Sequence, residues 1–109
     1  MKVFDFNKDS DLQLRAMEAL MEVIDPEMMV NIVDLGLIYQ VDFLEDGRLY
    51  LVMTLTSQFC PMGDAIQTGA RNALEHAFPD RTVEIELRFD PPWSYDLISP
   101  EGLEQLRNR

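Results

Sequence analysis

Cysteine and histidine are almost absent from this sequence of 109 residues, which holds only Cys60 and His76. A single thiol cannot form an internal disulfide, and by itself it cannot supply a metal site built from several thiolates. Long apolar runs are also absent, since none reaches the ~18 residues that a membrane helix needs. The first residues contain no apolar block of the signal-peptide type. These absences predict a cytoplasmic protein with no membrane partner.

Basic residues are scarce as well. Nine lysines and arginines stand against twenty aspartates and glutamates, which gives a formal net charge of −11 at pH 7. The acidic excess extends over the whole length, so no basic patch is present to neutralise phosphates, and a nucleic-acid partner is disfavoured. Hydrophobic residues make up 47% of the chain, which is enough for a real core. Length and composition therefore predict one folded domain over residues 1–109.

Apolar residues at helical spacing predict a first helix from Ser10 to about Ile24. Ser10 and Gln13 have the spacing of a capping box, in which two side chains bind the free backbone amides of a helix start. Pro26 ends this helix, because the residue before a proline is pushed out of the helical region. Residues 27–34 are expected to form an apolar loop.

Two runs of alternating apolar residues, 37–43 and 49–55, predict a pair of strands. Looping out residues 45–47 matches the apolar faces better than a two-residue turn does. This longer loop also uses Gly47 for the positive φ that such connections require. The expected cross-strand pairs are Phe43 with Leu49, Val41 with Leu51 and Tyr39 with Met53.

A second helix is predicted from Pro61, which suits a first helical position, to about Ala77. Alternation over residues 83–89 predicts a third strand with one apolar face, and Ser99 is expected to open a short last helix. The resulting order is α-β-β-α-β-α. A hairpin followed by a helical crossover gives a small three-stranded mixed sheet covered by helices, which is a two-layer α/β sandwich.

Cys60 is the leading candidate for chemistry. It is expected at or next to the N-cap of the second helix, where unpaired amides and the helix dipole favour a thiolate. The alternative is a small buried hydrophobic residue, which is the usual fate of a free cysteine. A cysteine–histidine nucleophile within one chain is excluded, because His76 would lie about 24 Å away along the same helix. His76 is expected at the surface near the helix C-terminus.

Asp25 and Thr56 are the other candidates. Asp25 follows the first helix in an extended conformation, and Thr56 ends the second strand four residues before Cys60. Each has a structural alternative, which is capping of the helix end for Asp25 and satisfaction of the turn backbone for Thr56. The residues alone leave both interpretations open.

Four motifs occur in order along nearly the whole chain, over about residues 12–107. They are Val23-Ile24-Asp25-Pro26-Glu27, then Asn31-Ile32-Val33-Asp34-Leu35-Gly36-Leu37-Ile38-Tyr39, then Met53-Thr54-Leu55-Thr56 with Cys60-Pro61-Met62, and last Asp90-Pro91-Pro92-Trp93. Together they resemble the small metal–sulfur cluster assembly proteins of the SufT and PaaD type. The resemblance implies the same α/β sandwich.

The resemblance also implies a factor that helps to mature iron–sulfur proteins through a reactive cysteine, and not an enzyme. Cys60 is the implied functional thiol or cluster ligand. A stable cluster needs about four ligands, so a chain with one thiolate would bind iron or a cluster transiently, shared with a second copy or a partner, or would bind none permanently. The implied partners are iron–sulfur assembly proteins and client apoproteins. The implied pocket residues are Asp25, Glu27, Thr54, Thr56 and Pro61.

Two other functions remain open. A non-catalytic adaptor would dock client or assembly proteins through exposed apolar side chains. An accessory subunit of a phenylacetate-type oxygenase system is suggested by the PaaD subfamily alone. The surface expected for the adaptor comprises Met28, Met29, Trp93 and Tyr95.

Overall fold

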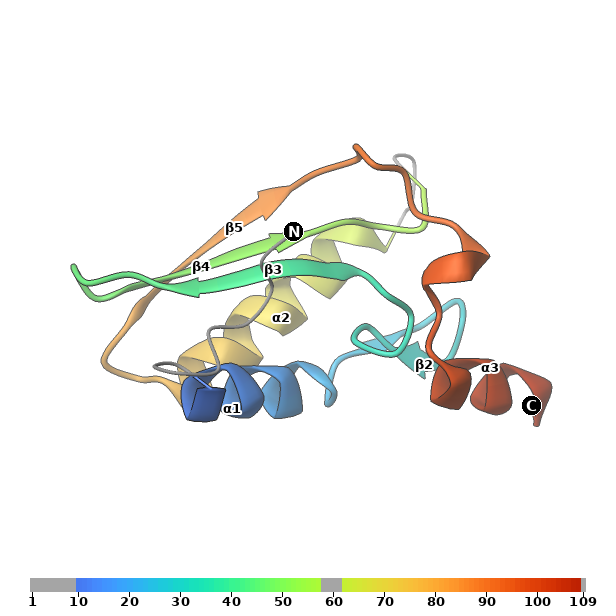
Figure 1. Ribbon diagram of the computed structural model, residues 1–109, viewed down its shortest axis with the longest axis horizontal. Helices are drawn as coiled ribbons and strands as arrows, with labels where there is room; N and C mark the ends of the chain where they lie inside the picture. The colour runs from blue at the N-terminus through green and yellow to red at the C-terminus, as the bar shows by residue number, and fades with distance from the viewer. Residues whose placement is uncertain (1–9, 58–61, 109) are drawn as a thin grey trace.

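A three-stranded sheet forms one layer of the protein, and two helices form the other (Figure 1). The computed structural model describes residues 10–57 and 62–108. The described elements are α1 (Ser10–Leu20), β1 (Ile24–Asp25), β2 (Val30–Asn31), β3 (Ile38–Phe43), β4 (Arg48–Met53), α2 (Gly63–Ala77), β5 (Thr82–Leu87), the 3-10 helix η1 (Tyr95–Leu97) and α3 (Pro100–Arg107).

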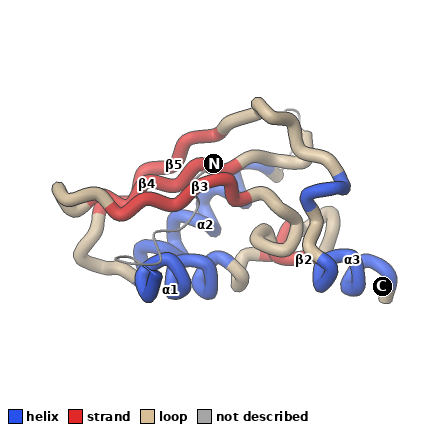
Figure 2. The backbone as a smooth tube through the Cα atoms, viewed as in Figure 1, coloured by secondary structure: helices blue, strands red, loops and turns tan. Residues whose placement is uncertain are grey.

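The central strand β4 pairs antiparallel with β3 and parallel with β5. Helix α1 packs against α2 and β3, and α2 packs against β5, so both helices lie on one side of the sheet (Figure 2). The predicted two-layer α/β sandwich with a small mixed sheet is confirmed. Beside it, β1 and β2 form a two-stranded antiparallel hairpin next to α3, which the alternation did not predict.

Alternation along the strands decides which face of the sheet meets the helices. Val41, Leu49 and Val83 are at most 3% exposed and belong to the hydrophobic core. Intervening positions carry polar side chains such as Asp42 and Glu84, and these form the face away from α1 and α2. Removal of the apolar face from water is the main term that stabilises the two layers.

The β3–β4 hairpin has the register expected from the three-residue loop over most of its length. Phe43 pairs with Leu49, and the turn glycine Gly47 has a φ of +93°. The last expected pair is wrong, because Ile38 and not Tyr39 stands opposite Met53. A bulge between Ile38 and residue 40 shifts the register there, and local alternation carries no signal for such an extra residue.

The first helix ends at Leu20, four residues before the predicted end at Ile24. Ile24 instead pairs with Asn31 in the β1–β2 hairpin, and the amide of Ile32 donates to the Val23 carbonyl at 2.9 Å. The expectation of a loop over residues 27–34 is therefore wrong for its middle part. Pairing between chain segments outweighs the helical spacing at this point, as tertiary contacts commonly do.

Gln13 does not act as the second half of a capping box. Its side-chain amide donates to the Val41 carbonyl at 2.7 Å, and the residue is only 4% exposed. The side chain thus ties α1 to β3 inside the core. The predicted role is wrong because Gln13 lies on the buried side of the helix.

The remaining helices agree better with the sequence. Helix α2 ends at Ala77 as predicted. Helix α3 follows Ser99, whose hydroxyl accepts a hydrogen bond from the amide of Gly102 at 2.9 Å. Within residues 10–57 and 62–108, no helix has the length and apolar character needed to cross a bilayer. The cytoplasmic location stays a prediction.

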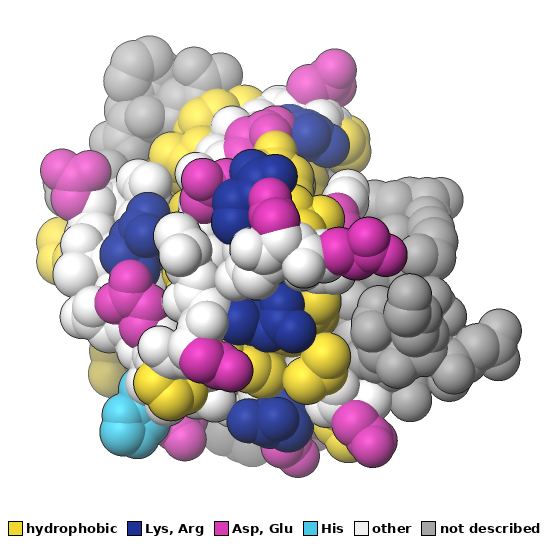
Figure 3. Space-filling view, turned by 90° about the vertical axis from the view of Figure 1, so that its left-hand side faces the viewer, with side chains coloured by type: hydrophobic (Ala, Val, Ile, Leu, Met, Phe, Trp, Pro, Cys, Tyr) yellow, Lys and Arg dark blue, Asp and Glu magenta, His cyan; other side chains and the backbone are white. Residues whose placement is uncertain are grey.

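Charges of both signs alternate at the end of the molecule that carries the β3–β4 turn (Figure 3). Arg48 lies 2.8 Å from Asp46 and 3.1 Å from Glu84. Arg15 donates to the Ala77 carbonyl and lies 4.6 Å from the centre of the Phe78 ring. Both arginines are thus engaged in contacts within the chain.

The buried carboxylate of Asp34 attaches the C-terminal part of the chain to the rest. One oxygen accepts a hydrogen bond from the side-chain amide of Asn31 at 2.8 Å, and the other accepts one from the Ser99 hydroxyl at 2.9 Å. The Ser99 amide also donates to the Asp34 carbonyl at 2.8 Å. A buried carboxylate with both oxygens satisfied stabilises the packing of α3, so this part of the second motif has a structural role.

Gly36 allows a close approach between the second motif and η1. Its φ is +80°, which favours glycine, and a side chain at this position would begin 2.7 Å from the Cβ of Leu97 and closer still to the Leu97 carbonyl. Gly47 shares the positive φ, but a Cβ added there would meet no other atom within 4 Å. A side chain at Gly36 would therefore cause both backbone strain and a steric clash, whereas a side chain at Gly47 would cause backbone strain alone.

We expect Gly36→Ala to lower the free energy of unfolding by about 3 kcal/mol or more, because strain and a backbone clash add. Gly47→Ala should lower it by only about 1 kcal/mol, the cost of the positive φ alone. Urea unfolding of both variants measures the difference. Equal losses would contradict the steric role of Gly36.

Candidate functional site

The first three motifs meet at one end of the sheet, where β4 ends. The amide of Thr54 donates to the Leu37 carbonyl at 2.8 Å, and the amide of Leu37 donates to the Ile32 carbonyl at 3.1 Å. Ile32 is in turn bonded to Val23, next to β1. This chain of backbone hydrogen bonds joins the Asp25 motif to the end of β4.

Asp25 is completely buried, and its two carboxylate oxygens differ. Oδ1 accepts hydrogen bonds from the amides of Glu27 at 2.8 Å and Met28 at 3.1 Å, which stabilises the turn after β1. Oδ2 is also buried, but it has no hydrogen-bond partner among the residues that the structure describes. The predicted alternative of helix capping is wrong, because Asp25 holds the β1–β2 turn and α1 ends five residues earlier. The turn uses only half of the carboxylate.

Thr54 and Tyr39 lie together beside the fourth motif. Thr54 follows β4 and is fully buried. The Tyr39 hydroxyl donates to the Pro91 carbonyl at 2.8 Å. Burial raises the pKa of this hydroxyl above its ordinary value, and a hydrogen bond with Thr54 offsets part of the effect. Tyr39 is a member of the site that the sequence reasoning did not single out, although it ends the second motif.

Trp93 is held by the second motif. Its indole N–H donates to the Leu35 carbonyl at 2.6 Å, and its ring centre lies 5.4 Å from that of Tyr95. Through Tyr39 and Trp93 the second and fourth motifs are therefore bonded to each other. Motifs that are more than 50 residues apart in the sequence form one end of the molecule.

Cys60 and Pro61 lie outside the residues that the structure describes, so their predicted roles stay predictions. Helix α2 has Met62 as its N-cap and begins at Gly63. Cys60 precedes this N-cap by two residues in the sequence, and its expected place at or next to the N-cap lies outside the described residues. His76 is exposed in the last turn of α2, as predicted.

The other expected pocket residues differ in exposure. Thr56 is half-buried two residues after Thr54, in a bend of the chain. The side chain of Glu27 is exposed, and its amide contributes to the turn around Asp25. Asp25 and Thr54 are thus the buried members of the expected pocket within the described part of the chain.

The surface expected for an adaptor is exposed in part. Met29 is 58% exposed and Tyr95 is 63% exposed. Met28 is half-buried against the core, and Trp93 is half-buried as well. Of the four expected residues, only Met29 and Tyr95 therefore present large apolar areas to a partner. Trp93 is instead hydrogen-bonded to the second motif.

A resident metal site is not found in the described residues. No group of three or more histidine, cysteine, aspartate or glutamate side chains within residues 10–57 and 62–108 is arranged to hold a metal ion.

Comparison with known proteins identifies the family. The family model described as "Iron-sulfur cluster assembly protein" matches residues 15–87. The chain belongs to this family. It is 41% identical over 88 residues to the "Fe-S protein maturation auxiliary factor YitW" of Bacillus subtilis, covering 81% of this chain and 86% of that protein. It is 39% identical over 77 residues to the "Fe-S protein maturation auxiliary factor SufT" of Staphylococcus aureus, covering 71% of this chain and 88% of that protein.

A solved structure from the same group supports the fold of this family member. The crystal structure of a domain of unknown function, DUF59, from Bacillus anthracis superposes with a TM-score of 0.88 at 31% identity. The match covers 96% of this chain and 100% of that one. The resemblance drawn from the four motifs is thereby confirmed.

Asp25 provides a test that separates folding from function. In Asp25→Asn the amide oxygen still accepts from the turn amides, so we expect the free energy of unfolding to stay within about 1 kcal/mol. Asp25→Ala removes both hydrogen bonds and should cost about 2 kcal/mol. If the second oxygen serves function, both variants lose activity in cluster maturation while only Asp25→Ala loses stability. An active Asp25→Asn would assign Asp25 to the turn alone.

Proposed function

We propose that this protein is an iron–sulfur cluster assembly or carrier factor that helps to mature iron–sulfur proteins in the cytoplasm. Family membership supports this role, because the relatives are named maturation auxiliary factors. The observation that carries the proposal to particular residues is the buried Asp25 Oδ2, which has no hydrogen-bond partner within the described part of the chain. An unsatisfied buried oxygen costs free energy, so its presence in Asp25 calls for an explanation, and a role in function is the one proposed here.

In this proposal the Cys60 thiolate ligates iron or a cluster as cargo. A thiol must lose its proton when it binds a metal. The Asp25 carboxylate, which the family resemblance places beside the thiol, is a proposed member of the cargo site, with Thr54 and Thr56 as neighbouring hydroxyl donors. Glu27 is the proposed rim of the pocket. Pro61, the residue after Cys60, is its last proposed member.

One thiolate is too few for stable binding of a cluster, which takes about four ligands. The proposed cargo is therefore held jointly, with the remaining ligands supplied by a second copy of the chain, an assembly protein or a client apoprotein. Such sharing favours transfer over storage. The role is that of a carrier and not of a catalyst.

The cysteine can be tested directly. We expect anaerobic reconstitution with iron and sulfide to give a cluster absorbance with the wild-type chain and only background with Cys60→Ser, because the chain then has no thiol. Glu101→Gln, an exposed change on α3, should reconstitute like the wild type.

Cells that lack their own maturation factor give the second measurement. Wild type and Glu101→Gln should restore the activity of an iron–sulfur enzyme, and Cys60→Ser should not. Cluster formation and rescue by Cys60→Ser would refute the role of the thiol.

An adaptor is the second candidate function, favoured by the exposure of Met29 and Tyr95. Met29 also has a φ of +59°, so Met29→Gly removes the apolar side chain without loss of stability. If the protein acts as an adaptor, Met29→Gly and Tyr95→Ala should each weaken binding to an iron–sulfur assembly partner by more than about tenfold, while Cys60→Ser binds normally. Pull-down titration with purified partner measures this. Unchanged binding by both surface variants would exclude the adaptor role of this surface.

A further inference from the structure

Among the strands that the structure describes, β5 is an edge of the sheet, and the direction of its backbone groups can be assigned residue by residue. The amide of Thr82 donates to the Gly47 carbonyl at 3.2 Å, and the amide of Arg88 donates to the Met53 carbonyl at 2.8 Å. Both bonds point toward β4. Because backbone groups alternate in direction along a strand, the groups of Val83 and the two alternate residues after it point away from β4.

One of these outward groups has a partner in the described part of the chain. The guanidinium of Arg71, on α2, donates to the Val83 carbonyl at 2.6 Å. The outward amides and carbonyls of Ile85 and Leu87 have no partner in residues 10–57 and 62–108. A row of unpaired backbone groups on an edge strand is a template for the addition of another strand.

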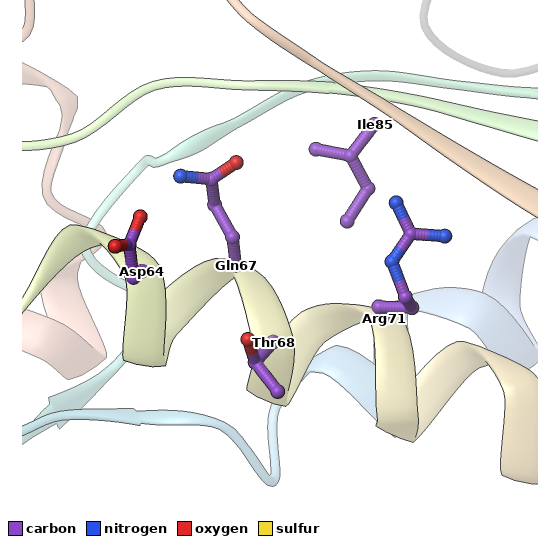
Figure 4. A pocket seen from close by; sticks show the side chains of 5 residues that line it. All are labelled: Asp64, Gln67, Thr68, Arg71 and Ile85. Atoms are coloured by element: carbon purple, nitrogen blue, oxygen red, sulfur yellow. The ribbon is translucent and has the colours of Figure 1, made fainter.

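A hollow of about 420 Å³ lies beside this edge. Its walls come from α2 and from Ile85 of β5, and Figure 4 shows the side chains of Gln67 and Arg71 directed toward the sheet. Side chains that an added strand directs toward the helix layer would lie at the margin of this hollow. The lining residues are Asp64, Gln67, Thr68, Arg71 and Ile85.

The other face of the edge carries two glutamates, each beside an arginine. Glu84 and Glu86 have side-chain exposures of 47% and 38% and point away from the helices. Each meets one arginine, Arg48 and Arg88, in exposed pairs that contribute little, and the chain as a whole carries a charge of −11. In antiparallel pairing of two copies about Ile85, Glu84 of one copy would stand opposite Glu86 of the other, which is destabilising. A basic partner fits this edge better than a second copy does.

We propose that the outer edge of β5 binds an extended basic segment of a partner protein as an added antiparallel strand. The apolar residues of that segment pair with Ile85 and Leu87 on the helix side of the sheet, at the margin of the hollow whose other walls are polar side chains of α2. Lysine or arginine residues alternate with them and stand beside Glu84 and Glu86. The surface needs neither Cys60 nor a cluster, so it is independent of the proposed carrier function.

The experiment uses the full chain, labelled with 15N, and the capped peptide Lys-Ile-Lys-Val-Lys-Ile-Lys as the probe. We expect the amide resonances of Ile85 and Leu87 to shift on titration and their hydrogen exchange to slow. Two further peptides have the same sequence and charge and carry equal numbers of backbone N-methyl groups, one on its apolar residues and the other on its lysines. Methylation of the apolar residues removes the amides that face β5 and should weaken binding by at least about tenfold, whereas methylation of the lysines should not.

A charge variant supplies the second test. Glu84→Lys should weaken binding of the lysine peptide by about fivefold, while Glu101→Lys, the same charge change on α3, should leave it unchanged. Equal binding of the two methylated peptides, or equal effects of the two charge variants, would overturn the proposal. Self-association of the free chain with shifts at Ile85 and Leu87 would overturn it in favour of a second copy.

Discussion

The close approach of Gly36 to Leu97 is the constraint on which the arrangement of the motifs depends. It brings η1 against the loop between β2 and β3, and the hydrogen bonds of Asp34 and Trp93 hold the two segments together there. The residues before η1 are thereby carried past Tyr39 at the end of the sheet. A side chain at position 36 would push these segments apart.

Two buried aspartates in neighbouring motifs show how differently one residue type can be used. Both oxygens of Asp34 are satisfied, by Asn31 and Ser99, and the residue fastens α3. Asp25 satisfies one oxygen in its own turn and leaves the other without a partner in the described residues. The first arrangement is that of a structural carboxylate, and the second leaves one oxygen of Asp25 for the role proposed above.

The two proposed surfaces would have separate tasks in a carrier, since one would bind the cargo and the other would bind a partner protein. One end of the sheet gathers the motif residues around Asp25 and Thr54, where cargo would be ligated. The outer edge of β5 lies along the sheet and presents backbone groups and acidic side chains, which suit recognition of a partner. Separation of the two would allow a partner to stay bound while the cargo ligands exchange.

The sequence by itself determined the sandwich, most of the hairpin register and the cap of α3 by Ser99, because alternation, turn glycines and caps act between near neighbours. It also determined the family, through motifs whose order needs no structure. Only the tertiary structure decided that α1 stops at Leu20, that Gln13 enters the core, that Tyr39 joins the site and that Asp25 and Asp34 differ. These features depend on pairing and burial between segments distant in the chain, and the free energy of such contacts exceeds the local preferences that a sequence displays.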